Sequence, residues 1–230
     1  MARTEANRRS ACGGRVFCLA ALLLATARAP AAAECQLTIA RLKYHGGGDW
    51  YANPSSLPNL ITAVRLKAGA VVCDTGAVVE IMDDRFFRYP FAYMTGHGNV
   101  HFTHEERLRL RSYLIGGGFL WADDNYGLDK PLRREMAALF PENPLTPLEE
   151  NHPVFTKVHR LPGLPKIHEH DGEPAQAFGV FWKGRMVVLY TYSSDIGDGM
   201  EDLDVHNDGP RLHELALQMG VNVVAWFLDP

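Results

Sequence analysis

The sequence predicts an α/β fold of three layers, in which helices cover both faces of a mostly parallel sheet. Apolar strand-like segments alternate with helix-like segments between residues 37 and 139, and such alternation with short connections is typical of parallel strands joined by helices. From residue 151 the pattern changes. Two strand-like segments at 179–182 and 186–192 flank a turn at 183–185 and predict an antiparallel hairpin added to the sheet.

The strand candidates of the first half are short apolar runs bounded by loop-forming residues. The run at 91–95 leads into a Gly-His-Gly turn, which is typical of a buried strand that ends in a loop. The run at 119–122 leads into Asp123, Asp124 and Asn125, which we expect in the following loop. The predicted strands are 37–42, 71–73, 78–81, 91–95 and 119–122.

Four helices are expected, each with recognisable ends. The first is capped by Ser55 or Ser56 and ends at Gly69. The second begins with Thr103 and Glu106, which have the T-x-x-E spacing of a capping box, and stops at the glycines 116–118. The third covers about 130–139, with Asp129 as its cap. The last covers about 210–227, with Pro210 at its first position.

The first 33 residues have the features of a secretory signal peptide. Arginines precede an apolar run at 16–27 that is too short to span a bilayer. Ala31 and Ala33 then satisfy the small-x-small rule of signal peptidase. We therefore expect one mature domain, residues 34–230, without a membrane span, in the periplasm or secreted from the cell.

The charge of the mature chain limits the class of partner that the sequence allows, and its cysteine content bears on disulfide formation. Removal of residues 1–33 leaves 18 basic and 26 acidic side chains, a formal net charge of −8. This balance argues against nucleic acid as a partner, because its binding needs clustered Lys and Arg. The mature chain keeps Cys35 and Cys73. The expected compartment permits disulfides, but the sequence leaves open whether these two cysteines pair.

Several long motifs resemble the family called domain of unknown function 4159. They are RLKYHGGGDWYANPSSLPNL, YMTGHG, GGGFLWADDNYG, PGLPKIHEHDG and YSSDIGDGMEDLDVHND, and together they span nearly the whole mature chain. That family is in turn similar to the class I glutamine-amidotransferase-like fold, a flavodoxin-like α/β arrangement, in its trehalose-utilisation-type branch. The resemblance implies a fold and carries no established reaction with it.

The amidotransferase nucleophile is missing. Enzymes of that fold place a cysteine on the sharp turn after a central strand, and here the turn after 119–122 carries Asp123 and Asp124. Cys73 lies far upstream beside another strand. Glutamine hydrolysis by a thiolate is therefore not expected.

Polar residues follow several of the predicted strands. Ligands of open parallel sheets bind outside the carboxyl ends of the strands, so residues that begin these loops are candidates for a site. The ligand-binding candidates are His45, Asp49, His97, Asn99 and Asn125. Asp123 and Asp124 are the catalytic candidates, because a carboxylate there is placed to take a proton from an activated water.

The string His168-Glu169-His170 suggests a metal site. In an extended segment two histidines at a spacing of two point to the same face, and neutral imidazoles so placed can share one ion. With a carboxylate such as Asp195 they are candidates to hold zinc, iron or manganese. The alternative is that these histidines are solvated loop residues. Asp195 begins an acidic run, 195–208, that does not have EF-hand spacing and that is more simply explained as a solvated acidic loop.

Two functional hypotheses from different classes follow. The first is a crevice lined by His and Asp that binds a small polar or carbohydrate-like ligand and, with a bound metal, hydrolyses it. The second is an inert module of the cell envelope that serves as a scaffold for protein partners.

Overall fold

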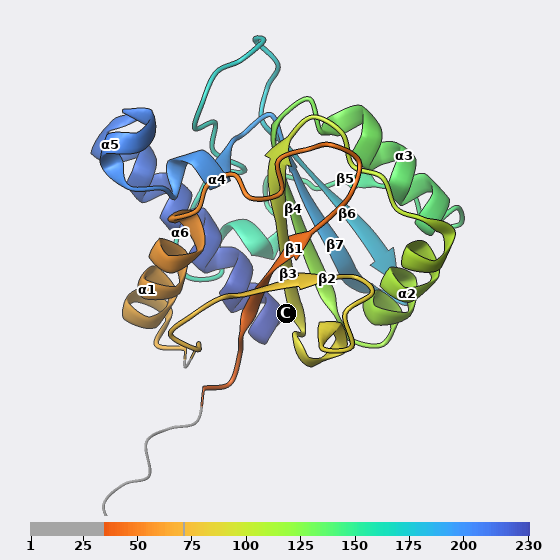
Figure 1. Cartoon of the computed structure of the whole chain (residues 1–230). Helices are drawn as coiled ribbons and strands as arrows, with labels where there is room; N and C mark the ends of the chain where they lie inside the picture. The colour runs from red at the N-terminus through yellow and green to blue at the C-terminus, as the bar shows by residue number, and fades with distance from the viewer. Residues whose placement is uncertain (1–34, 71) are drawn as a thin grey trace, which may run out of the picture. The chain divides into compact units, whose positions relative to one another are not determined.

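The computed structural model describes residues 35–70 and 72–230, which form a seven-stranded mixed sheet with helices on both faces (Figure 1). The predicted signal peptide, residues 1–33, lies outside the described residues, as does Val71. In the described part of the chain, no helix combines the length and the apolar character needed to cross a membrane. The expected α/β fold is confirmed.

The strands are arranged in the order β2-β1-β3-β4-β7-β6-β5. Strands β2, β1, β3, β4 and β7 pair in parallel, and this parallel part has the doubly wound order of flavodoxin-like folds. Strands β6 and β5 add to it in antiparallel fashion. The strands are β1 (Ile39–Lys43), β2 (Ala77–Glu80), β3 (Phe91–His97), β4 (Phe119–Tyr126), β5 (Thr146–Pro147), β6 (Gln176–Trp182) and β7 (Arg185–Tyr192).

The helices form the two outer layers. In Figure 1, α1, α4, α5 and α6 lie on one side of the sheet and α2 and α3 on the other. The helices are α1 (Ser56–Ala68), α2 (His104–Ile115), α3 (Asp129–Leu139), α4 (Ile196–Gly199), α5 (Leu203–His206) and α6 (Gly209–Leu228). Two 3₁₀ turns complete the described elements, η1 (Phe86–Arg88) and η2 (Pro153–Phe155).

Alternating side chains of the strands build one apolar core on each face. Phe91 and Tyr93 of β3 belong to the core under α1 and α6, whereas Ala92 and Met94 belong to the core under α2 and α3. All four side chains are fully buried. Both faces of the sheet are therefore covered, which explains why the parallel strands are almost continuously apolar.

Local signals place several element ends where the sequence predicts them. The capping box is formed, since Thr103 Oγ1 accepts from Glu106 N at 3.1 Å and Glu106 Oε2 accepts from Thr103 N at 2.8 Å. Gly69 ends α1 in the left-handed conformation with φ 63°. The predicted hairpin is also confirmed, and its turn consists of Lys183 and Gly184, both with positive φ.

Two predicted boundaries are wrong, the end of β4 and the start of α3. Strand β4 continues through Asp123 to Tyr126 and does not end at residue 122. The cap of α3 is Leu128, and Asp129 is the first helical residue. The reason is a contact from outside the helix: Oδ1 of Asp124 accepts from Leu128 N at 2.9 Å and so satisfies a free N–H group of the first turn.

Cys35 and Cys73 form a disulfide bond. This pairing, which the sequence leaves open, lies ahead of β1, where Leu37 bridges to Val72 and Cys73 N donates to Leu37 O. The bond therefore ties the start of the described chain to the segment before β2.

The middle of α6 is anchored by Asn222, which is fully buried. Its Oδ1 accepts from the backbone N–H groups of Val158 at 2.9 Å and His159 at 2.7 Å. Its Nδ2 donates to the carbonyl oxygens of Phe155 at 2.9 Å and His159 at 2.8 Å. One side chain thus satisfies four backbone groups of the segment that follows η2.

Candidate functional site

The loop after β1 and the loop after β3 are joined by backbone hydrogen bonds at the point where the strand order reverses. Gly48 N donates to Asn99 O at 2.8 Å, and His101 N donates to His45 O at 2.8 Å. A Cβ atom at Gly48 would lie 2.7 Å from the carbonyl oxygens of His97 and Asn99, so this close approach requires glycine. The switch point, where such folds usually bind ligands, is occupied here by the chain itself.

Asp49 and His97, two of the ligand-binding candidates, meet within these loops. Asp49 Oδ2 lies 3.0 Å from Nδ1 of His97, and Asp49 Oδ1 accepts from the backbone N–H of His97. Both side chains are partly exposed. Asp49 therefore holds the imidazole in one orientation at the carboxyl end of β3.

His45 and Asn99, two further candidates, stabilise the loops from outside. His45 is exposed, and its Nε2 lies 3.8 Å from Glu106 Oε1 at the start of α2. Asn99 Nδ2 donates to Gly46 O at 2.8 Å, and its Oδ1 accepts from Arg134 at 3.3 Å. The structure places both residues toward α2 and α3. Neither lines the cavity described below.

The catalytic candidates Asp123 and Asp124 are buried acceptors on β4. Asp123 accepts from the Thr191 hydroxyl through Oδ1 and from Gly197 N through Oδ2, the latter at 2.7 Å. Asp124 accepts from Leu128 N and, at 3.3 Å, from the Tyr190 hydroxyl. All four carboxylate oxygens thus bond to the protein and fix the starts of α3 and α4. A catalytic role for either residue stays a prediction.

Asn125 is the extra residue of a β-bulge. Gly96 of β3 pairs with Asp124, but His97 pairs with Tyr126, so Asn125 has no partner in the register. Its Oδ1 accepts from Thr95 Oγ1 at 2.7 Å and its Nδ2 donates to Asp198 Oδ1 at 2.6 Å. Bulges are frequent beside binding sites because they redirect side chains. Here the bulge carries the amide of Asn125 to the wall of a cavity.

The cavity beside β4 and β7 has a volume of about 320 Å³, and Asp195 is one of its lining residues. Asp195 is fully buried and adopts the left-handed conformation with φ 59°. Neither of its carboxylate oxygens receives a hydrogen bond from any described residue. The cavity is lined by Asp124, Asn125, Tyr126, Gly127, Asp129, Lys130, His170, Asp171, Tyr192, Ser193 and Asp195.

His170 covers Asp195. Its Nε2 lies 2.9 Å from Asp195 Oδ2, but the ring is not aligned for a hydrogen bond to that oxygen. The imidazole stacks on Tyr126 with 4.9 Å between the ring centroids. His170 belongs to the segment 164–175, which contains no helix or strand. The contact is therefore made by a loop residue against a residue fixed in the core.

Burial sets the protonation of this pair. Desolvation, followed by the nearby carboxylates of Asp123 and Asp198, raises the pKa of Asp195 to about 9. Desolvation, followed by the neighbouring His168, lowers the pKa of His170. At neutral pH both groups are consequently uncharged, so the pair gains little from Coulomb attraction.

The three predicted metal ligands, His168, His170 and Asp195, do not converge on one point. The rings of His168 and His170 lie close, with 5.0 Å between centroids, but Nδ1 of His168 lies 3.0 Å from Asp208 and not near Asp195. In residues 35–70 and 72–230, no three His, Cys, Asp or Glu side chains form a group arranged to hold a metal ion. Metal binding by His168, His170 and Asp195 stays a prediction.

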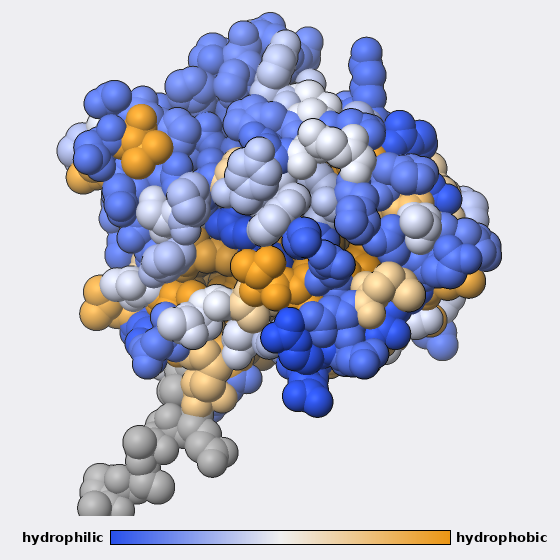
Figure 2. Space-filling model, viewed as in Figure 1, coloured by the Kyte–Doolittle hydropathy of each residue, from blue (hydrophilic) through white to orange (hydrophobic). Residues whose placement is uncertain are grey.

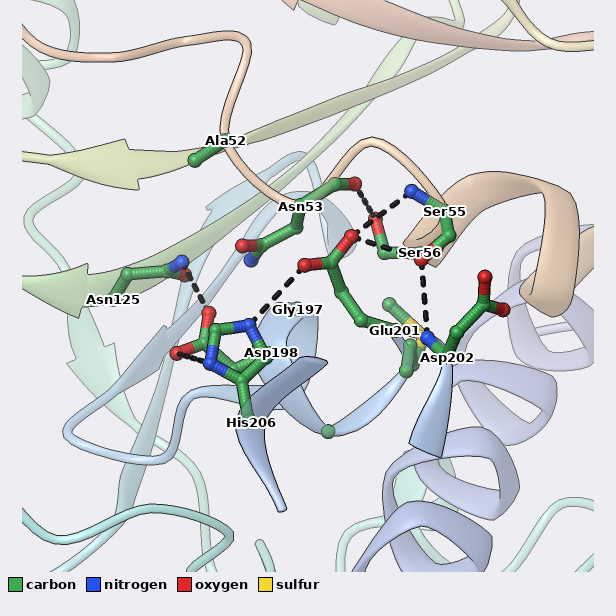
Figure 3. Close-up of polar contacts among 12 residues, drawn as sticks. Ala52, Asn53, Ser55, Ser56, Asn125, Gly197, Asp198, Glu201, Asp202 and His206 are labelled. Atoms are coloured by element: carbon green, nitrogen blue, oxygen red, sulfur yellow. Dashed lines mark hydrogen bonds and ion pairs between the residues drawn. The ribbon is translucent and has the colours of Figure 1, made fainter. Parts of the chain in front are cut away.

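The acidic run 195–208 is solvated only in part, since Asp202 and Asp204 are exposed but other acids of the run are buried. Asp198 and Glu201 are almost fully buried. As Figure 3 shows, Glu201 reaches the start of α1, where its Oε1 accepts from Ser55 N and Ser55 Oγ, both at 2.9 Å. The imidazole of His206 lies between the two acids, 3.2 Å from Glu201 and 3.7 Å from Asp198. These contacts hold residues 198–206, which follow Asp195 in the sequence, against the start of α1.

A larger cavity, of about 900 Å³, lies away from these groups, between residues 147–166 and the start of α6. Its wall is mixed: Leu148, Phe155 and Leu212 are apolar, whereas Glu150, Lys166 and Arg211 carry charges. None of the predicted site residues lines it. Of the predicted site residues, Asp124, Asn125, His170 and Asp195 line the smaller cavity.

The buried acids predict a dependence of stability on pH. Burial raises the pKa of Asp123 to about 7 and that of Asp195 to about 9, so between pH 7 and 9 the folded state binds more protons than the unfolded state. The free energy of unfolding is then expected to fall as pH rises, by about 2 kcal/mol over this window. Urea unfolding at pH 7, 8 and 9 measures the slope. The variant Asp195→Asn should flatten it, and an unchanged slope in that variant would contradict the assignment.

The fold and the crevice together define an α/β domain of the doubly wound class, with a cavity lined by carboxyl groups and an imidazole at the carboxyl ends of its strands. A family model described as Domain of unknown function (DUF4159) matches residues 38–228, and the chain belongs to this family. The family resemblance of the sequence motifs is thereby confirmed. A search of curated proteins gave no match.

Proposed function

We propose that this domain binds a small polar or carbohydrate-like ligand in the cavity beside Asp195. The observation that carries the proposal is the carboxyl group of Asp195, which is fully buried and lacks a hydrogen-bond donor among the described residues. A buried polar group without a partner costs on the order of 1–3 kcal/mol. Such a cost is typical of sites that a ligand completes.

The rest of the cavity wall suits a polar ring. Tyr126, half exposed, and Tyr192 supply aromatic faces, on which sugar rings stack. Figure 2 shows that the loops at the end of the molecule where β4 terminates are mostly hydrophilic. A polar molecule can therefore approach this end without crossing an apolar surface.

The kinship with class I glutamine-amidotransferase-like domains belongs to the same proposal. It is supported by the parallel strand order β2-β1-β3-β4-β7 and by the position of the cavity at the carboxyl ends of β4 and β7. Thiol chemistry does not form part of it, because Cys35 and Cys73, the two described cysteines, are joined in a disulfide. The central strand carries Asp123 where those enzymes have a nucleophile.

Export to the periplasm or the cell exterior also remains a proposal. It is supported by the arginine-rich start and apolar run of the first 33 residues. The disulfide between Cys35 and Cys73 agrees with it, since such bonds persist in oxidising compartments. Metal-dependent hydrolysis through His168 and His170 stays a prediction that elemental analysis of untagged protein can test.

Asp195→Asn is expected to weaken ligand binding by about 10- to 100-fold, because one hydrogen bond to a charged or acidic group contributes about 1.5–3 kcal/mol. Asparagine keeps the size of the side chain and tolerates the left-handed backbone. Calorimetric titration with a panel of neutral and amino monosaccharides measures the affinity.

The matched control for this measurement is Asp204→Asn, which changes an exposed acid of the same run. It should bind like the parent protein. Equal affinity of the Asp195 variant and the parent would show that the ligand does not use Asp195. If no monosaccharide bound to the parent protein, the scaffold hypothesis would gain support in place of this one.

A further inference from the structure

The wall of the cavity beside Asp195 is strongly acidic. Four of its lining residues carry carboxyl groups, and only Lys130 and His170 can oppose them. Asp129 is already paired, since its Oδ1 accepts from Arg133 Nε at 2.6 Å and from the Tyr190 hydroxyl at 3.0 Å. Asp124 accepts from Leu128 N through Oδ1, and its Oδ2 shares the single hydroxyl proton of Tyr190 with Asp129. Asp171 is exposed, so Asp195 is the buried carboxyl group of the wall that no described residue satisfies.

The group already beside Asp195 indicates what the site attracts. A ring nitrogen, Nε2 of His170, lies 2.9 Å from Asp195 Oδ2, yet the ring does not point an N–H at that oxygen. An ammonium group has three rotatable N–H donors and can align with both oxygens. A ligand of this kind would satisfy Asp195 better than the imidazole does.

The aromatic side chains favour the same chemistry. His170 covers the ring of Tyr126, and Tyr192 forms another part of the wall. When a loop residue such as His170 moves aside, the face of Tyr126 becomes free to bind a cation. An anionic ligand would find one lysine, Lys130, against the carboxyl groups of the wall, and a neutral sugar would leave Asp195 without a charged partner.

We propose that the ligand of this site carries a protonated amino group, as amino sugars and other small polar amines do, and that this group displaces His170 and pairs with Asp195. The inference rests on the proposed binding function and narrows it to cationic ligands. On binding, Asp195 releases its proton to solvent, so the bound pair is an ammonium and a carboxylate.

Calorimetric titration of the mature protein with D-glucosamine, D-glucose and N-acetyl-D-glucosamine tests the proposal. The three sugars share one ring and differ at a single substituent, which is cationic only in glucosamine. Glucosamine is expected to bind at least tenfold more tightly than the other two. Asp195→Asn should abolish this preference, and Asp204→Asn should preserve it.

The outcomes separate this inference from the proposed function. Comparable affinity for all three sugars would overturn the requirement for an amino group and leave the polar-ligand function standing. A preference for glucosamine that survives in Asp195→Asn would overturn the pairing with Asp195. Binding of none of the three would overturn both.

Discussion

Replacement of Asn222 by alanine is expected to lower the free energy of unfolding by about 3–4 kcal/mol. The side chain of Asn222 makes four hydrogen bonds to backbone groups of residues 155–159, and alanine would leave these groups without partners inside the protein. Because the asparagine is fully buried, water cannot replace it without opening the packing of α6. Urea unfolding followed by tryptophan fluorescence measures the loss.

The same helix provides the control for this measurement. Gln218 lies one turn before Asn222 and is only partly buried, and its amide bonds to Glu214 on α6 itself. Gln218→Ala should cost less than about 1 kcal/mol. Similar losses in the two variants would show that the segment after η2 is held by its apolar contacts and not by Asn222.

Removal of the disulfide is expected to lower the free energy of unfolding by about as much as Asn222→Ala does. The bond between Cys35 and Cys73 closes a loop with a sequence separation of 38, for which the chain-entropy estimate is about 4 kcal/mol of stability. The double variant Cys35→Ala/Cys73→Ala should therefore unfold at a clearly lower urea concentration than the oxidised parent protein, and with a steeper slope, because its unfolded chain is less compact.

Reductant supplies the control for the disulfide. Adding it should bring the parent protein to the stability of the cysteine-free variant and leave that variant unchanged. If the oxidised protein and the variant differed by less than about 1 kcal/mol, the two ends of this loop would already lie close together in the unfolded state.

The parts of the fold predicted correctly are those determined by neighbours in the sequence. Thr103 and Glu106 lie three residues apart and cap the same helix turn, so the motif alone locates the start of α2. Gly69 ends α1 because glycine readily adopts positive φ. The hairpin of β6 and β7 is likewise joined by a two-residue turn.

The wrong boundary after residue 122 has a cause that is distant in the sequence. A run of Asp123, Asp124 and Asn125 resembles a loop because unpaired carboxylates do not belong in a buried strand. In the structure the partners of Asp123 are Thr191 and Gly197, and those of Asn125 are Thr95 and Asp198, all at least 30 residues away in the sequence. Sequence spacing does not indicate such donors.

The site could be predicted in outline only. Placing polar residues at the carboxyl ends of the strands correctly directs attention to Asn125 and Asp195, which line one cavity. The spacing of His168 and His170 predicts neighbouring rings but not their partners, since each imidazole meets a different aspartate. The burial of Asp198 and Glu201 could not be predicted from the acidic run, because their partners Asn125 and Ser55 lie in other segments.

The position of β7 between β4 and β6 also determines when the cavity can form during folding. Trp121 on β4 and Thr191 on β7 are 70 residues apart in the sequence, so their pairing requires a large loop to close first. The hairpin of β6 and β7 is local and can form within microseconds. We expect β7 to join the sheet as part of this preformed hairpin. The cavity residues on β4 and those in the segment after β7 are therefore expected to come together late in folding, after most of the parallel sheet has formed.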